Sequence, residues 1–146
     1  MRPAEAVDRF QLEPAACSER TEHRFPTGAA ARASDASKRG WVPEWIPPAA
    51  KDVRLLCDLD TNEVWIRFEL PEHERTALVS GLSAVPWEST GAVKIRSAGT
   101  PWWFQGLIQD QPSNDGALNA DMFRGPDRVV LLERTGPRVY AYVYGE

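Results

Sequence analysis

The sequence has few cysteines, no cluster of basic residues and no long apolar run, and each shortage argues against a class of protein. Two cysteines, Cys17 and Cys57, are too few and too far apart for a zinc site. A net charge of −4 with scattered Lys and Arg argues against a nucleic-acid partner. No apolar stretch approaches the roughly 20 residues that cross a bilayer, so we expect no transmembrane segment.

Residues 1–23 mix charge, proline and alanine without periodicity, which predicts a poorly ordered tail before one domain at residues 24–146. The charges in this tail do not fit a secretion signal. The sequence as it stands therefore predicts a cytoplasmic protein. If the translation start is misassigned, a location in the cell envelope is the alternative. Cys17 and Cys57 would pair only in an oxidising compartment, and we interpret them as unrelated thiols.

Two stretches have the composition of helices. The alanine-rich stretch predicts a helix over residues 28–39, with Thr27 as its N-cap and Gly40 as its stop. A second helix is predicted over residues 72–84, because Pro71 suits a helix start. Apolar residues also recur there at three- and four-residue spacing, which indicates one buried stripe.

Residues 41–48 combine two tryptophans with three prolines. Prolines at this density exclude a regular helix or a central strand. The segment is nevertheless too apolar for a solvated loop. We therefore expect an irregular strap that packs across the core.

Alternation of apolar and polar residues indicates two β-hairpins, at residues 52–70 and 129–144. Turn-forming residues connect their strands at 58–62 and 135–137. With the two helices, these hairpins predict an α+β fold. In it, a small antiparallel sheet carries both helices on one face.

Residues 86–128 have a weaker pattern. Candidate elements are a short strand at 94–96, a strand or packed loop at 101–108, and a turn at 111–116. A structureless loop of this length would be unusual inside a compact domain, so this assignment is incomplete.

The polar turn contains oxygen ligands at calcium-loop spacing. Asp58, Asp60 and Asn62 precede Glu69, which lies eleven residues after Asp58. A calcium loop needs glycine at its sixth position, however, and this chain has Glu63 there. The pattern therefore favours a plain hairpin turn whose polar side chains bond their own backbone.

No G-x-S-x-G, phosphate-binding loop or H-E-x-x-H motif occurs. We interpret Cys57 as a small core residue rather than a nucleophile paired with His73. The remaining catalytic alternative is a small hydrolase or ligand-binding enzyme with Asp58, Asp60 and His73 as acid–base groups. We expect no metal and no cofactor, and the sequence favours a non-enzymatic protein.

Aromatic residues are abundant and gather in two places. Tyr140, Tyr142 and Tyr144 share one face of the last predicted strand, and Trp102 and Trp103 are adjacent. If the aliphatic face packs inward, the rings form an outward platform of the kind enriched in binding surfaces. The alternative is that a helix or the strap covers the rings and the aliphatic face points outward.

The stretch from Phe25 to Phe68 has a characteristic set of motifs. It is sharpest at R-G-W (residues 39–41), with Pro43 and Pro47 following, and at the turn D-L-D-T-N. This set resembles a group of small bacterial proteins with a YbbD head domain. The resemblance extends less specifically to the Trp pair and the C-terminal hairpin, about 120 residues in all. Many such proteins look exported or lipid-anchored, and the resemblance implies no catalytic residues.

The leading hypothesis is a non-enzymatic domain that binds a protein partner or a small ligand, with an association with the cell envelope as an option. Its expected binding residues are Trp102, Trp103, Tyr140, Tyr142 and Tyr144. The alternatives are the small enzyme and a structural accessory subunit. The sequence leaves the oligomeric state open.

Overall fold

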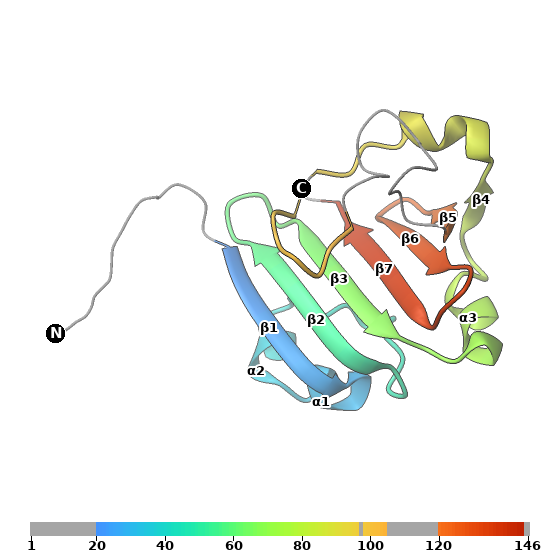
Figure 1. The fold of residues 1–146 in the computed structure, drawn as a ribbon. Coiled ribbons are helices and arrows are strands. Elements are labelled where there is room, and N and C mark those ends of the chain that lie inside the picture. Colours follow the sequence, from blue (N-terminus) through green and yellow to red (C-terminus); the bar gives the residue numbers. More distant parts are fainter. Residues whose placement is uncertain (1–19, 97, 105–119, 145–146) are drawn as a thin grey trace, which may run out of the picture.

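The computed structural model describes residues 20–96, 98–104 and 120–144. Within these ranges, seven strands form one antiparallel sheet in the order β1-β2-β3-β7-β6-β5-β4 (Figure 1). The strands are β1 (Arg20–Thr27), β2 (Lys51–Asp58), β3 (Val64–Glu69), β4 (Ser83–Val85), β5 (Ala120–Arg124), β6 (Arg128–Glu133) and β7 (Arg138–Val143). The helices are α1 (Gly28–Arg32), α2 (Asp35–Lys38), α3 (Glu72–Leu78) and a 3-10 helix, η1 (Trp87–Ala92).

The fold is α+β in the coarse sense, but strands dominate it. β2 pairs with β3 and β6 pairs with β7, inside the two segments interpreted as hairpins. The prediction of a sheet built from two hairpins is nevertheless incomplete, because β1, β4 and β5 extend the sheet on both sides. Two of these strands are short, and the third is polar, so their alternation is hard to see in the sequence.

Strand β1 begins inside the segment that the sequence assigned to a tail. The domain start expected at residue 24 therefore lies within a strand that begins at Arg20. β1 pairs only with β2 and forms an edge of the sheet, where charged side chains and Pro26 are tolerated. A strand with this composition resembles a solvated tail when only its sequence is considered.

The helix expected over residues 28–39 is broken into two short helices. Thr27 caps α1 as predicted, with its hydroxyl accepting a hydrogen bond from the N–H of Ala30 (3.0 Å). Ser34 then caps α2 in the same way and so interrupts the first helix. Gly40 follows α2 with a φ of +86°, as expected for a helix stop. No helix within the described ranges is long and apolar enough to span a membrane.

The helix expected over residues 72–84 is also too long. α3 ends at Leu78, and Ser83–Val85 form the edge strand β4. Leu82 packs against the core beneath the helices, whereas Val85 packs against the core on the opposite face. The apolar spacing that suggested one helical stripe therefore belongs to a turn and a strand that face different ways.

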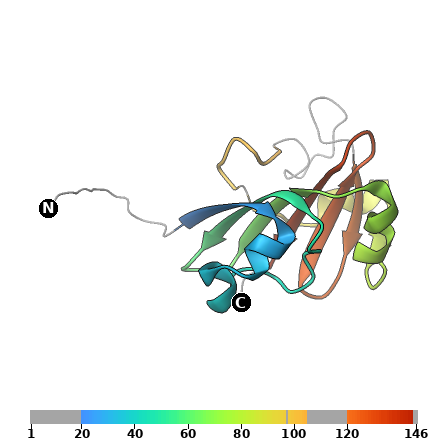
Figure 2. The same cartoon turned by 90° about the horizontal axis from the view of Figure 1, so that it is seen from below.

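The sheet has a core on each face, because alternate residues of each strand point to opposite sides. Leu55, Ile66 and Ala141 belong to the core on the helix side. Their neighbours Trp65 and Tyr142 belong to the core on the other side. In Figure 2, α1 and α2 lie on one side of the sheet and the segment 98–104 lies on the other.

The proline-rich strap packs across the helix-side core, as predicted. Ile46 is fully buried, and Trp41 and Trp45 are partly buried against the same cluster. Gly28 at the start of α1 lies against Pro47 of the strap, and the N–H of Ala29 donates to the carbonyl of Pro48 (3.1 Å). The strap thus fastens α1 to the end of the sheet.

The remaining predictions for residues 86–128 have mixed outcomes. Residues 94–96 do not form a strand. Of the segment 101–108, residues 101–104 form a packed loop in which Trp102 and Trp103 are buried, and residues 105–108 lie outside the described residues. The predicted turn at 111–116 lies outside the described residues.

Candidate functional site

The five aromatic residues predicted as a binding surface lie together, but they are covered. Trp102, Trp103, Tyr140 and Tyr142 are at most 8% exposed, and Tyr144 is partly buried. The Trp103 ring meets the Tyr140 ring edge-on, with 5.6 Å between centroids. The open platform, one of the two alternatives, is therefore wrong. The other alternative is wrong as well in placing the aliphatic face outward, because Val139 and Ala141 are fully buried in the helix-side core. The assignment of the five aromatic residues to ligand binding stays a prediction, and their burial removes its basis.

The cover is formed by the irregular residues 93–96 and 98–104, and by neither a helix nor the strap. Polar contacts hold it on the sheet in addition to apolar packing. The indole N–H of Trp65 donates to the carbonyl of Arg96 (2.8 Å), and Arg20 donates to the carbonyl of Ala98 (2.8 Å). The indole N–H of Trp102 donates to Glu22. Side chains of the sheet therefore satisfy backbone groups in a segment that lacks regular structure.

A buried carboxylate, Glu63, lies at the centre of this fastening. It accepts hydrogen bonds from the hydroxyl of Thr61 (2.7 Å), from Arg96 (2.6 Å) and from the hydroxyl of Tyr142. Burial and the bond to Glu63 raise the pKa of Tyr142 above its ordinary value. Tyr142 therefore remains protonated at neutral pH and acts as a donor that holds the cover.

The turn after β2 is a plain polar turn, as predicted. One oxygen of buried Asp58 accepts from the backbone N–H groups of Asp60 (3.0 Å) and Thr61 (3.2 Å). Its other oxygen accepts from Arg20 (3.1 Å). Burial alone would raise the pKa of Asp58, but the Arg20 guanidinium and the turn N–H groups outweigh it and lower the pKa. Asp58 is thus fully engaged in local structure.

The structure does not bring the candidate acid–base groups together. Asp58 lies at the turn before β3, whereas His73 lies in α3, after the far end of β3. The six residues of β3 span about 20 Å. The His73 side chain is 80% exposed and lies 3.8 Å from Glu74. Cys57 is a core residue, as predicted, and burial raises the pKa of its thiol to about 12.

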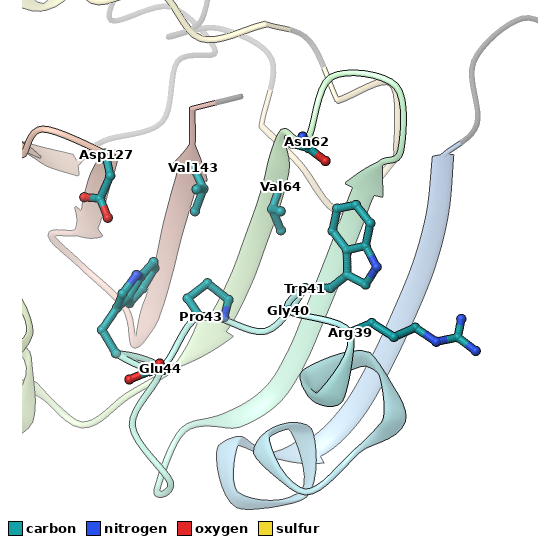
Figure 3. A pocket seen from close by; sticks show the side chains of 10 residues that line it. Arg39, Gly40, Trp41, Pro43, Glu44, Asn62, Val64, Asp127 and Val143 are labelled. Carbon is teal, nitrogen blue, oxygen red and sulfur yellow. The ribbon is translucent and has the colours of Figure 1, made fainter. Parts of the chain in front are cut away.

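A groove that the sequence did not predict lies beside the strap (Figure 3). Its volume is about 540 Å³. Trp41, Pro43 and Trp45 line it from the strap, while Val64 and Val143 line it from the sheet. The groove therefore combines an aromatic wall with an aliphatic floor, and we call it the Trp41 groove.

Charges of opposite sign border the Trp41 groove. Figure 3 shows Glu44 and Asp127 on one side of Pro43 and Arg39 beyond Trp41 on the other. Asp127 is paired with Arg128 (2.9 Å), whose guanidinium lies 4.8 Å from the centroid of the Trp45 ring. A cation thus already occupies a face of Trp45.

A second hollow, of about 500 Å³, lies on the other side of Trp41. It shares Arg39 and Trp41 with the groove, and β1 contributes Phe25 to its lining. Leu59 also lines it and is 43% exposed, the largest exposure of a bulky apolar side chain among the described residues. We call this the Leu59 hollow.

The sequence missed the groove because tertiary structure assembles it. Asp127 and Val143 lie more than 60 residues from the strap and reach it only through the pairing of β3 with β7. Gly40 and Asn62, which both have positive φ, turn the chain beside it. The available signal was the pair of tryptophans interleaved with prolines, which we had interpreted only as core packing.

These features define a strand-dominated α+β domain with an open groove beside a proline-rich strap. Residues 19–69 match the model of the YbbD head domain, so the resemblance is confirmed over β1, the strap, β2 and β3. The match includes Trp41 of the groove but not Asp127 or Val143. No curated protein matches this chain, and no solved structure does.

Proposed function

We propose that this chain is a non-enzymatic binding domain that recognises a protein partner or a small ligand at the Trp41 groove. The observation that carries the proposal is the pair of half-buried indoles, Trp41 and Trp45, beside an open concavity. Tryptophan is enriched among residues that dominate binding energy. Ligand sites are typically concave and largely apolar, with a few polar groups, and the groove has this composition.

The ionisable groups of the groove support binding over catalysis. They are Arg39, Glu44 and Asp127, and Asp127 is paired with Arg128. These groups include no nucleophile beside a general base, which is the arrangement that hydrolysis by a side chain requires. The acid–base groups of the enzyme alternative lie apart, as described above.

The exposed surface also supports a local site over a broad structural interface. Obligate subunit interfaces are large and apolar. Among the described residues, Leu59 is the one bulky apolar side chain that is counted as exposed. This surface is therefore less consistent with the structural-subunit alternative than with a local binding site.

An association with the cell envelope remains part of the proposal, because the chain resembles proteins that look exported. Fractionation of cells that express the tagged full chain tests it. Recovery in the envelope fraction would support this part, and recovery in the soluble cytoplasmic fraction alone, which the sequence as it stands predicts, would contradict it.

The binding proposal is tested with a partner recovered on the tagged chain, identified, purified and titrated by calorimetry. We expect Trp41→Ala to weaken binding at least about tenfold, because truncating an aromatic anchor commonly costs more than 1 kcal/mol. Trp41→Phe keeps a ring and serves as the matched control. Glu72→Gln, at an exposed position of α3, controls for distant changes.

Circular dichroism must show that each variant is folded, since Trp41 also contacts the core. Equal affinity of folded Trp41→Ala and wild type would remove the groove from the proposal. A second titration with Trp45→Phe then shows whether the other wall contributes.

A further inference from the structure

The Trp41 groove and the Leu59 hollow are two halves of one longer surface. Both are lined by Arg39 and Trp41, so the Trp41 side chain separates them. Their volumes, about 540 Å³ and 500 Å³, are similar. A compact ligand would fill one half, whereas a ligand that crosses Trp41 contacts both.

We infer, building on the proposed function, that this surface binds an extended polypeptide segment with an apolar centre, a basic side chain at one end and an acidic side chain at the other. Extended peptides commonly bind in grooves lined by aromatic rings. An extended chain advances about 3.3 Å per residue, so a few residues suffice to cross an indole ring.

The apolar centre of the peptide follows from the side chains around Trp41, which separates the two halves. Trp41 contributes to both halves, Val64 and Val143 line one half, and Phe25 and Leu59 line the other. Covering the exposed part of Leu59 removes apolar surface from water, which favours an apolar side chain in the hollow.

The polarity of the peptide follows from the charges at the two ends. Glu44 is exposed at the groove end, and Arg39 is exposed beyond Trp41. Asp127 is already paired with Arg128, and Asp35 at the hollow lies 3.9 Å from Lys38. Glu44 and Arg39 are therefore the charges that the peptide complements. The peptide places a basic side chain near Glu44 and an acidic side chain near Arg39.

The test uses four synthetic peptides of about eight residues, blocked at both ends, with the same Pro-Leu centre. One carries Lys at one end and Glu at the other, one Lys at both ends, one Glu at both ends, and one Ser at both ends. Binding is followed by NMR through the indole N–H signal of Trp41, which is assigned from its loss in Trp41→Phe. We expect the mixed-charge peptide to bind tightest.

Charge reversals on the protein then test the two ends separately. Arg39→Glu should shift the preference toward the peptide with Lys at both ends, and Glu44→Lys toward the peptide with Glu at both ends. Each shift should be about threefold to fivefold, the size of an exposed ion pair. Arg32→Glu is the matched control, because Arg32 is an exposed basic residue in α1 that lines neither half.

Two results would overturn the inference. If the peptides move the Trp41 signal but neither charge reversal changes the order of their affinities, the surface binds without the proposed polarity. If none of the peptides moves the Trp41 signal, the occupant is not such a segment. The titration with the purified partner decides the proposed function in either case.

Discussion

At the scale of single residues, α1 and the strap approach each other closely at Gly28. A Cβ at Gly28 would lie 1.9 Å from the carbonyl oxygen of Pro47. That oxygen belongs to backbone, so either the helix or the strap would have to move. We expect Gly28→Ala to lower the free energy of unfolding by about 1–3 kcal/mol, the usual cost of overpacking. Urea unfolding followed by circular dichroism measures it.

Gly81→Ala is the matched control, because a Cβ there meets no heavy atom within 4 Å. Its effect should be close to zero. Equal stability of Gly28→Ala and wild type would show that the strap adjusts freely and does not fix the position of α1.

The lowered pKa of Asp58 predicts that the stability of the fold depends on pH. Its pKa is lower in the folded protein than in the unfolded chain, because Arg20 and the turn N–H groups favour the carboxylate. The stabilisation is complete above the unfolded pKa of about 3.9 and is lost as the pH falls through the folded pKa. We therefore expect the free energy of unfolding to decrease below about pH 4.

Asp58→Asn should flatten this part of the pH profile, measured by urea unfolding at a series of pH values. Asp60→Asn, in the same turn and exposed, should leave the profile as in wild type. If Asp58→Asn and wild type lose stability in parallel, other carboxylates carry the acid dependence.

At the scale of elements, the cover formed by residues 93–96 and 98–104 depends on the buried carboxylate of Glu63. Replacing Glu63 by Leu leaves the Tyr142 hydroxyl without its acceptor and Arg96 without its carboxylate. An unsatisfied buried polar group costs about 1–3 kcal/mol, so Glu63→Leu should be destabilising by at least that amount. Near-UV circular dichroism should also change, because Trp65 and Tyr142 pack under the cover.

A double-mutant cycle with Tyr142→Phe isolates the bond itself. We expect a coupling of about 0.5–3 kcal/mol between positions 63 and 142. Strictly additive effects would mean that the hydrogen bond between Glu63 and Tyr142 does not contribute to holding the cover.

The sequence predicts an element well where neighbouring residues determine it, and poorly where residues distant in the sequence do. The strap, the Thr27 cap and the polar turn at Asp58 depend on local chemistry, and all three were predicted. The helix expected at residues 72–84 failed because residues three and four apart can also come from a turn and a strand. The open aromatic face failed because its cover comes from a segment with no local pattern. The Trp41 groove requires residues from distant strands, which one sequence does not place together.

At the scale of the whole molecule, β3 and β7 join the two halves of the sheet. β3 pairs with β7 over six residue pairs, and this is the junction between strands β1–β3 and strands β4–β7. Both faces of β3 depend on the C-terminal half, since Ile66 shares a core with Ala141, and Trp65 contacts Tyr142. The segment that matches the YbbD head domain ends at residue 69 and therefore lacks half of its own core.

We therefore predict that residues 20–70 expressed alone do not fold. Removing the C-terminal half exposes the edge of β3 and side chains that are fully buried in the intact chain, including Trp65, Ile66 and Phe68. A fragment of this size buries too little apolar surface to offset the entropy of ordering its backbone. Its amide NMR spectrum should be poorly dispersed, and its thermal unfolding should show no cooperative transition.

Adding residues 71–146 as a second polypeptide provides the stringent control. If the β3–β7 junction holds the fold together, mixing the two fragments should restore dispersion and a cooperative transition. It should also restore the Trp41 groove, whose floor needs Val64 from one fragment and Val143 from the other. A dispersed spectrum for residues 20–70 alone would contradict this reasoning. The matched segment would then be an autonomous unit, and the part of the groove formed by Trp41 would have to bind without its floor.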